Sequence, residues 1–189
     1  MPAALPGTVS GLVLAAGAGR RFGGPKALAR TSAGTPWLAL AVRALREGGC
    51  RDVAVALGAG FDEAAGLVPA GAAIVRVDEW ATGVAASLRA GLEVVASGSS
   101  DAVLVLPVDT PDVPATAIAR LARRAEPGAL AQATYDGAPG HPVLLGRAHW
   151  AGISATVTGD IGARPYLIAQ EADLVECGDL WSGVDRDTR

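Results

Sequence analysis

The sequence has little cysteine and no strong excess of either charge. Only two cysteines occur in 189 residues, Cys50 and Cys177, and neither has a metal-type spacing or a nearby histidine. Neither a disulfide framework nor a zinc site is indicated, and we expect both thiols to be reduced and packed. The formal net charge is −3, with both signs spread along the chain. Proteins that bind nucleic acid or anionic membranes usually carry a basic patch, so we expect no partner of either kind.

Long hydrophobic runs are also missing. No apolar stretch approaches the roughly 20 residues needed to cross a bilayer. The N-terminal MPAALPGTVS lacks the basic start of a signal peptide. We therefore expect a cytoplasmic protein that acts on a small molecule.

Small aliphatic residues dominate the composition instead. Half of the residues are hydrophobic, but only 4% are aromatic. Alanine, valine, leucine and glycine suit thin layers of helices packed closely on a sheet. A chain of this length buries roughly 70% of its unfolded surface, and no linker or repeat divides it. We therefore expect a single domain over residues 1–189.

Strand and helix patterns alternate along the chain. Strands are predicted at Val9–Ala15, Asp52–Leu57, Ala73–Val77 and Asp101–Leu106, and helices at Pro36–Glu47, Thr82–Ala96 and Pro114–Arg124. Ala129–Thr134 and Pro142–Leu145 flank an Asp-Gly turn signal and are expected to pair as a hairpin. The alternation predicts an α/β fold with a doubly wound, mainly parallel sheet that the hairpin makes mixed.

A glycine-rich loop follows the first predicted strand. The segment GLVLAAGAGRRFGGPK contains Gly17, Gly19, Gly23 and Gly24. Backbone amides in such a loop can approach an anion without interference from Cβ atoms, so we expect the loop to hold phosphate. The plain alternative is a glycine-rich connection with solvated cations.

Three cations lie in and just beyond this loop. Arg20 and Arg21 can form forked hydrogen bonds to phosphate oxygens, and Lys26 adds a compact charge at the far end. The loop is not a Walker P-loop, because Lys26 follows a proline and precedes an alanine. It is also a poor dinucleotide fingerprint, because the glycines read GxGxxxG rather than GxGxxG. A nucleotide polyphosphate is the favoured ligand.

A carboxylate follows the strand DAVLVL. Asp109 comes just after it, in a loop stiffened by Pro107 and Pro111. The carboxyl edge of a parallel sheet is where ligands bind, and a carboxylate there can hold Mg²⁺ against phosphates. The alternative is a turn residue or the N-cap of the next helix.

Five segments, in order, resemble the motifs of the MobA-like nucleotidyltransferases, the group that contains molybdopterin cytidylyltransferase and molybdopterin-guanine dinucleotide synthase. LAAGAGRRFGGPKAL resembles LAAGxSxRxGxxK, and WATGVAASLRAGL resembles W-x-x-G-x-x-x-S-L-x-x-G. LPVDTPDVP, GHPVLLGRAHW and GDIGAR resemble the later motifs. The resemblance spans most of the chain. It implies a Rossmann-like three-layer αβα sandwich with a mixed sheet, and transfer of a nucleoside monophosphate to a phosphorylated acceptor with release of pyrophosphate.

The resemblance also implies roles for individual residues. It implies that the catalytic residues are Arg21, Lys26 and Asp109. The nucleotide-binding residues would be Leu14, Ala15, Ala16, Gly17, Gly19, Arg20, Gly83 and Ser87, and the acceptor-binding residues would be His141, Asp160 and Arg164. Two alternatives stay open: Ser87 can be a packing residue, and Asp160 can pair with Arg164 across one helical turn.

The ending SGVDRDTR resembles the family ending D-x-D-T-P. It implies a second Mg²⁺ ligand beside Asp109, at Asp187 or, in another alignment, at Asp185. Arg189 stands where the family has proline. A solvated acidic tail is the alternative.

The identity of the substrates rests on weaker signals. The AAG of Ala15–Gly17 resembles the cytidylyltransferase branch, which implies CTP, a molybdopterin acceptor and a molybdoenzyme partner of the xanthine dehydrogenase type. Two other functions stay open. One is an NAD(P)H-dependent oxidoreductase of the nicotine-blue-oxidoreductase type on the same fold; the other is a non-catalytic protein that delivers cofactor to a molybdoenzyme. Hydride transfer has no need of a metal carboxylate at Asp109, and retention of Lys26 and Asp109 argues against delivery alone.

Overall fold

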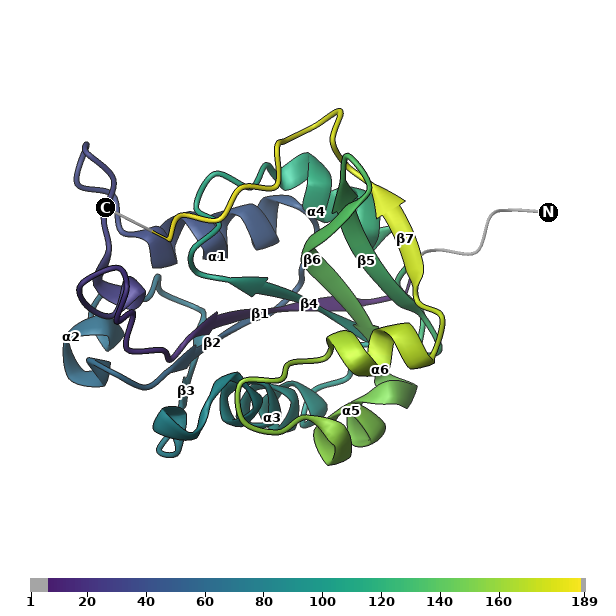
Figure 1. The fold of residues 1–189 in the computed structure, drawn as a ribbon, viewed down its shortest axis with the longest axis horizontal. Coiled ribbons are helices and arrows are strands. Elements are labelled where there is room, and N and C mark those ends of the chain that lie inside the picture. Colours follow the sequence, from purple (N-terminus) through teal and green to yellow (C-terminus); the bar gives the residue numbers. More distant parts are fainter. Residues whose placement is uncertain (1–6, 188–189) are drawn as a thin grey trace.

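The computed structural model describes residues 7–187 and contains one seven-stranded sheet (Figure 1). The strands are β1 (Val9–Ala15), β2 (Val53–Leu57), β3 (Ala73–Arg76), β4 (Ala102–Pro107), β5 (Leu130–Tyr135), β6 (Ala138–Gly146) and β7 (Asp173–Glu176). Their order is β3-β2-β1-β4-β6-β5-β7. Only β6 runs antiparallel to its neighbours, β4 and β5. The mainly parallel, mixed sheet confirms the predicted fold.

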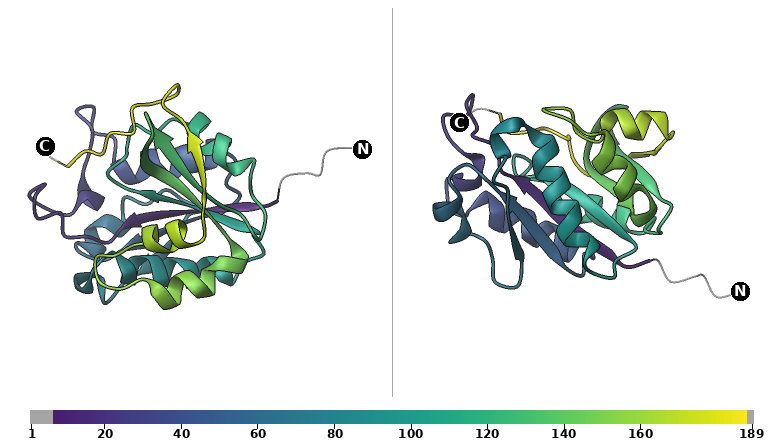
Figure 2. Two further views of the ribbon diagram at one scale, coloured as in Figure 1. Left: turned by 45° about the vertical axis from the view of Figure 1, so that its right-hand side comes forward. Right: turned by 90° about the horizontal axis from the view of Figure 1, so that it is seen from below.

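Helices cover both faces of the sheet (Figures 1 and 2). One face carries α1 (Trp37–Glu47) and α4 (Ala115–Ala122); the other carries α3 (Val84–Ala96), α5 (Trp150–Thr156) and α6 (Arg164–Ala169). The short α2 (Phe61–Ala65) follows β2, and single 3₁₀ turns occur at η1 (Lys26–Leu28), η2 (Trp80–Thr82) and η3 (Arg147–His149). The predicted three-layer αβα sandwich is therefore confirmed. None of the helices within residues 7–187 is long and apolar enough to cross a bilayer.

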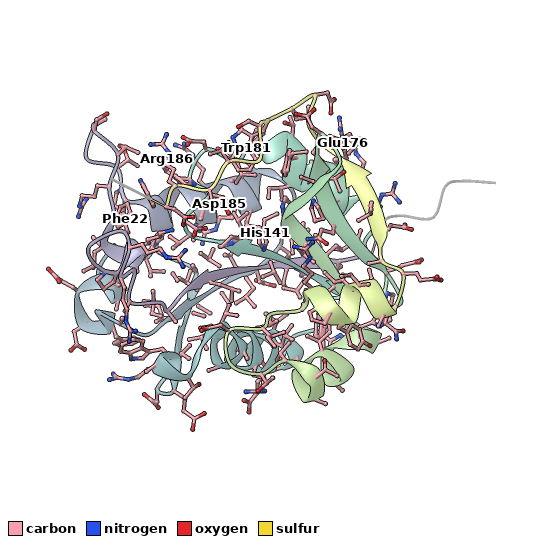
Figure 3. All side chains as sticks on the ribbon, viewed as in Figure 1. Phe22, His141, Glu176, Trp181, Asp185 and Arg186 are labelled. Atoms are coloured by element: carbon pink, nitrogen blue, oxygen red, sulfur yellow. The ribbon has the colours of Figure 1, made fainter. Side chains whose placement is uncertain are left out.

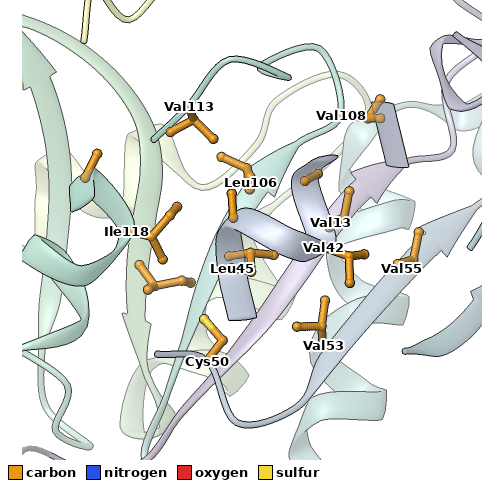
Figure 4. Close-up of a cluster of buried hydrophobic side chains, with 14 of the residues drawn as sticks. Val13, Val42, Leu45, Cys50, Val53, Val55, Leu106, Val108, Val113 and Ile118 are labelled. Atoms are coloured by element: carbon orange, nitrogen blue, oxygen red, sulfur yellow. The ribbon is translucent and has the colours of Figure 1, made fainter. Parts of the chain in front are cut away.

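The core consists of two apolar layers, one on each face of the sheet. Successive strand side chains point to opposite faces, so Val13 and Leu104 pack under α1 and α4 while Leu12 and Val103 pack under α3. Figure 4 shows the first of these layers. Gly91 lets α3 lie close to the sheet, because a Cβ there would stand 2.5 Å from a methyl carbon of Leu12. Burial on both faces explains why the central strands are continuously hydrophobic.

The predicted elements exist, and most of their boundaries move by no more than two residues; the exception is the strand expected at Pro142–Leu145, which begins four residues earlier, at Ala138. The helix expected at Pro114–Arg124 begins after Pro114, which is extended and acts as its N-cap. The helix expected at Thr82–Ala96 begins after Gly83, because Thr82 belongs to η2. Four short elements, α2, α5, α6 and β7, lie outside the elements predicted from the sequence. Residues 1–6 and 188–189, with Arg189 at the family's proline position, lie outside the described part of the chain.

Both cysteines are buried and free of disulfides, as expected. Burial raises the pKa of the Cys50 thiol to about 12, so this group stays protonated at neutral pH. Burial also raises the pKa of Cys177, although the charge of Arg120 acts to lower it. The two thiols are therefore packing groups.

Candidate functional site

A cleft of about 530 Å³ opens at the carboxyl ends of β1 and β4. Of the residues assigned from the sequence, it is lined by Leu14, Ala15, Ala16, Gly17, Gly19, Arg20, Lys26, Gly83, Ser87, Asp109, His141 and Asp160. Parallel strands end together at this edge, which is the usual ligand position in open α/β sheets. The structure thus brings most of the predicted site residues to one place, whereas Arg21, Arg164, Asp185 and Asp187 do not line the cleft.

Lys26 joins two carboxylates at the edge of the cleft. Its Nζ donates to Asp109 Oδ2 at 2.9 Å and to Asp187 Oδ1 at 2.7 Å. Burial acts to lower the pKa of Lys26, but hydrogen bonds and charge from the two aspartates raise it above its ordinary value. The hydrogen bond from Lys26 lowers the pKa of Asp187, with a smaller contribution from the nearby charge of Arg21. Lys26 and Asp187 are therefore both charged at neutral pH.

Two further carboxylates, Asp185 and Asp187, lie close enough to Asp109 and Lys26 to affect or feel their charge. Asp109 Oδ1 is buried and has no hydrogen-bond partner within residues 7–187. The pKa of Asp185 is raised by burial and then by the charges of Asp109 and Asp187. No three acidic, histidine or cysteine side chains of the described chain are grouped as a complete metal site. The arrangement fits a divalent cation that takes one or two ligands from these carboxylates and the rest from a bound phosphate, which is how Mg²⁺ is usually held.

The carboxyl-terminal segment, residues 177–187, crosses over to the end of β4 (Figure 1). The backbone N–H of Arg186 donates to the Asp109 carbonyl at 2.8 Å, and its Nε donates to Asp112 Oδ2 at 2.7 Å. Upstream, Trp181 contacts Tyr135 edge-on, with ring centroids 5.3 Å apart. Figure 3 shows Asp185 and Arg186 on this segment. Asp112 and Arg186 are not among the predicted site residues, although they lie within the segments LPVDTPDVP and SGVDRDTR.

The glycine-rich loop is curled around one carbonyl oxygen. The backbone amides of Phe22, Gly23 and Gly24 all donate to the Gly19 carbonyl, at 3.0, 3.0 and 3.1 Å. The expectation that Gly23 and Gly24 offer their amides to a ligand is therefore wrong. The amide of Gly17, which lines the cleft, has no acceptor in the described part of the chain. Gly19 has φ of +57°, and a Cβ there would collide with the Gly24 carbonyl, so the curl requires glycine.

The start of α3 forms the opposite wall of the cleft. Gly83 is its N-cap with φ of +120°, and a Cβ at this position would collide with the backbone of Gly159. Ser87 lies one turn on and is only 4% exposed. Trp80, in η2, also lines the cleft, although it is not among the predicted site residues. The sequence signal for a role of Trp80 in the site is its position as the first residue of the W-x-x-G segment.

His141 lies between this cleft and a second cavity of about 280 Å³. Burial lowers the pKa of its imidazole, against an opposing effect from Asp109, so the ring is neutral at neutral pH. Arg164 lines the second cavity instead of the cleft. Asp160 lies in the turn before α6, which begins at Arg164, so the two cannot pair across a helical turn as the alternative reading supposed.

Comparison with known proteins gives a family match over most of the chain. Residues 11–174 match the family model of the MobA-like NTP transferase domain. Nicotine blue oxidoreductase of Paenarthrobacter nicotinovorans is 34% identical over 193 residues, which covers 95% of this chain and 92% of that protein. Bifunctional enzyme IspD/IspF of Novosphingobium aromaticivorans is 37% identical over 119 residues, which covers 62% of this chain and 31% of that protein.

Solved structures share the fold at lower identity. Rv0371c of Mycobacterium tuberculosis H37Rv matches with a TM-score of 0.79 at 23% identity, over 97% of this chain and 94% of that one. A nucleotidyl transferase of Methanothermobacter, Mth528, matches with a TM-score of 0.78 at 21% identity, over 96% and 92%. A complex of Rv0371c with manganese matches with a TM-score of 0.71 at 23% identity, over 90% and 87%. These likenesses show the fold.

Proposed function

This chain belongs to the MobA-like NTP transferase family, and on that premise we propose that it is a magnesium-dependent nucleotidyltransferase formed by a single domain. The observation that supports this most directly is the contact of Lys26 with Asp109 and Asp187 at one cleft. Attack on the α-phosphorus of a nucleoside triphosphate brings anions together, so such an enzyme needs cations and metal-binding carboxylates in one place.

The residues fit a divalent cation. Asp109 offers a buried oxygen without a partner, and either Asp187 or Asp185 can supply a second ligand. Mg²⁺ held there would neutralise charge on the phosphate oxygens during transfer. A relative of the same fold has been solved with manganese, which agrees with a divalent cation. Lys26 would then turn from the aspartates toward the triphosphate, flanked by Arg20 and Arg21.

The proposed reaction needs alignment more than proton transfer. An anionic phosphate oxygen of the acceptor attacks the α-phosphorus, and a new P–O bond forms as the bond to the β-phosphate breaks. Pyrophosphate leaves with that electron pair, so charge and atoms balance without a general base. The neutral imidazole of His141 lies beside the cleft and can share a hydrogen bond with the acceptor. The chain's own task is to hold both reactants in line.

We propose CTP as the nucleotide and a molybdopterin-type acceptor, in a pathway that serves a molybdoenzyme. The AAG at Ala15–Gly17 and the five motif segments support both choices. The nucleotide would lie along the β1 loop and the start of α3, near Gly83 and Ser87. The acceptor would approach from the side of His141, Asp160 and Arg164.

A thermal-shift screen tests the function. A ligand at 100 times its dissociation constant stabilises a protein by about 2.7 kcal/mol, which corresponds to roughly 5–11 °C for a chain of this size. We expect that response to CTP with Mg²⁺, and weaker responses to GTP, ATP and UTP. Equal responses to all four nucleotides would contradict the choice of CTP.

Asp109→Asn tests the metal role. We expect this variant to lose Mg²⁺-dependent pyrophosphate release at least a hundredfold, since it removes a charged metal ligand, yet to retain some nucleotide binding. The matched control is Asp173→Asn, which changes an aspartate on β7 and should release pyrophosphate normally. Normal pyrophosphate release by Asp109→Asn would mean that Asp109 is not a metal ligand.

A second candidate is an NAD(P)H-dependent oxidoreductase. The name of the relative from Paenarthrobacter nicotinovorans, 34% identical over nearly the whole chain, favours it. The same screen separates the two functions. Stabilisation by NADPH without Mg²⁺, with no response to any nucleoside triphosphate, would support hydride transfer and refute the proposed function.

A further inference from the structure

The strand β6 is irregular where it carries His141. Along the ladder of β5 with β6, the paired positions on β5 advance from 132 to 134, while those on β6 step back from 143 to 139. Residues 140–142 therefore lie opposite Ala133 alone, and Pro142 has no N–H group to offer to the ladder. Extra residues of this kind form a β-bulge, and bulges beside binding sites re-aim a side chain. This bulge brings His141 to the wall of the cleft.

Two side chains of β5 hold the bulge. The Tyr135 hydroxyl donates to the His141 carbonyl at 2.6 Å, and Gln132 Nε2 donates to the Gly140 carbonyl at 3.2 Å. Burial, with smaller effects of nearby charges, raises the pKa of the Tyr135 hydroxyl, so this group keeps its proton and can donate at neutral pH. A side-chain donor thus reaches two successive carbonyls at the place where the ladder is interrupted.

The ring of Tyr135 is tightly packed, and the residue is only 6% exposed. A Cβ at Gly140 would stand 2.8 Å from the ring, and a Cβ at Gly183 would collide with it. Trp181 adds its edge-on contact from the carboxyl-terminal segment. Because the ring has little room to turn, its hydroxyl stays at the His141 carbonyl.

We propose that Tyr135 is a positioning residue for His141. Its hydroxyl, acting through the His141 carbonyl, holds the bulge in the shape that directs the imidazole to the cleft, and Gln132 supports that shape at the Gly140 carbonyl. Within residues 7–187, Tyr135 does not line the cleft, so it acts through His141 and touches no reactant. The inference rests on the proposed function in one respect, since His141 would hydrogen-bond the acceptor in that orientation.

The chain offers a matched pair of variants, because it contains two tyrosines and two histidines. Tyr166 contacts the other histidine, with its hydroxyl 3.1 Å from His149 Nδ1. Both Tyr135→Phe and Tyr166→Phe keep the ring and remove only the hydroxyl. The readout is NMR spectroscopy of the protein with isotope-labelled histidine rings, and His149→Gln assigns the two sets of ring signals.

We expect one sharp set of signals for the His141 ring in the wild-type protein. Tyr135→Phe should broaden or double this set and leave the His149 set unchanged, because the imidazole then takes more than one orientation. Tyr166→Phe should leave the His141 set single and sharp. A His141 set that is as single and sharp in Tyr135→Phe as in the wild type would overturn the positioning role.

Gln132→Leu keeps the inference testable if Tyr135→Phe does not fold. It removes the donor to the Gly140 carbonyl, and we expect it to broaden or double the His141 set in the same way. An unchanged His141 set in this variant would then overturn the positioning role.

Steady-state kinetics separates positioning from general damage to the fold. With CTP, Mg²⁺ and molybdopterin as the acceptor, we expect Tyr135→Phe to lower kcat/KM for the acceptor about tenfold, since misplacing a group by about 1 Å can cost up to about a hundredfold. The KM for CTP should stay within about twofold of the wild-type value, and Tyr166→Phe should change neither quantity. Equal losses for the acceptor and for CTP would contradict a role that acts through His141.

The two measurements also separate this inference from the proposed function. If the wild-type protein releases no pyrophosphate with any nucleotide, the proposed function fails, and the NMR comparison still decides whether Tyr135 orients His141. Normal pyrophosphate release together with unchanged His141 signals in Tyr135→Phe would keep the proposed function and refute the positioning role.

Discussion

Lys26→Met is expected to lower the free energy of unfolding by about 2 kcal/mol at pH 7 in the absence of metal. Methionine keeps most of the length of the side chain and removes its charge. The Lys26 and Asp109 side chains are 15% and 24% exposed, so their pair is neither a surface pair nor a fully buried one. Exposed pairs contribute about 0–1 kcal/mol, and breaking a buried pair costs about 3–5 kcal/mol. The intermediate exposure places the loss between these ranges.

Urea denaturation measures this loss, and thermal melting should show a decrease of roughly 4–8 °C. The double variant Lys26→Met/Asp109→Asn should be more stable than Lys26→Met alone, because it leaves no carboxylate buried beside an uncharged neighbour. Arg124→Met is the matched control. It breaks an exposed pair with Asp173, at 48% and 66% exposure, and should change stability by less than about 0.5 kcal/mol.

Two results would refute this reasoning. A Lys26→Met protein as stable as the Arg124→Met control would mean that the pair with Asp109 adds no net stability. A double variant less stable than Lys26→Met would mean that Asp109 is stabilised by something other than the ammonium group. Either result would leave the site without the electrostatic coupling on which the metal assignment depends.

Three further predictions concern pH, the curled loop and the carboxyl-terminal segment. The raised pKa of Lys26 gives stability that is present below about pH 10 and lost above it, and the lowered pKa of Asp187 gives stability present above about pH 4 and lost as pH falls. Urea melts should therefore show the deficit of Lys26→Met as constant near neutral pH and smaller at both extremes. Gly19→Ala should destabilise the fold by about 1–3 kcal/mol in calorimetry, because of its positive φ and the collision with Gly24. Arg186→Ala should change stability by less than about 1 kcal/mol, since its ion pair is half exposed. It should nevertheless raise the Mg²⁺ concentration for half-maximal stabilisation by CTP about two- to fivefold, and Arg186→Lys should restore it.

The sequence was sufficient to place Lys26 and Asp109 at the same edge of the sheet. Each follows a buried apolar strand, and parallel strands that lie side by side end at a common edge. The structure shows β1 and β4 as neighbours, which is why residues 83 positions apart in sequence are in contact. Periodicity and glycine placement carry this information because they depend on local backbone geometry and burial.

The partner contacts of the carboxyl-terminal segment could not be predicted in the same way. Asp187 reaches Lys26 across 161 positions of sequence, and Arg186 reaches Asp112 across 74. These pairs depend on the path of an irregular segment that has no periodicity. The same applies to Gly23 and Gly24: composition indicates that their amides can point outward, but only the folded loop shows that the Gly19 carbonyl accepts them.

The balance of charge at the site distinguishes the two candidate functions. Lys26 contacts Asp109 and Asp187, and the raised pKa of Asp185 reflects burial and then the charges of those two aspartates. Two like charges 4 Å apart repel by about 4 kcal/mol at an effective dielectric constant of 20. A free triphosphate would therefore be repelled by these carboxylates, whereas a triphosphate that arrives with a divalent cation would be attracted. A nicotinamide dinucleotide gains nothing from such an arrangement, because hydride transfer places no metal between its phosphates and the protein. If the chain is a nucleotidyltransferase, these carboxylates should therefore make its nucleotide affinity depend strongly on Mg²⁺. An oxidoreductase that uses NAD(P)H does not require such a dependence.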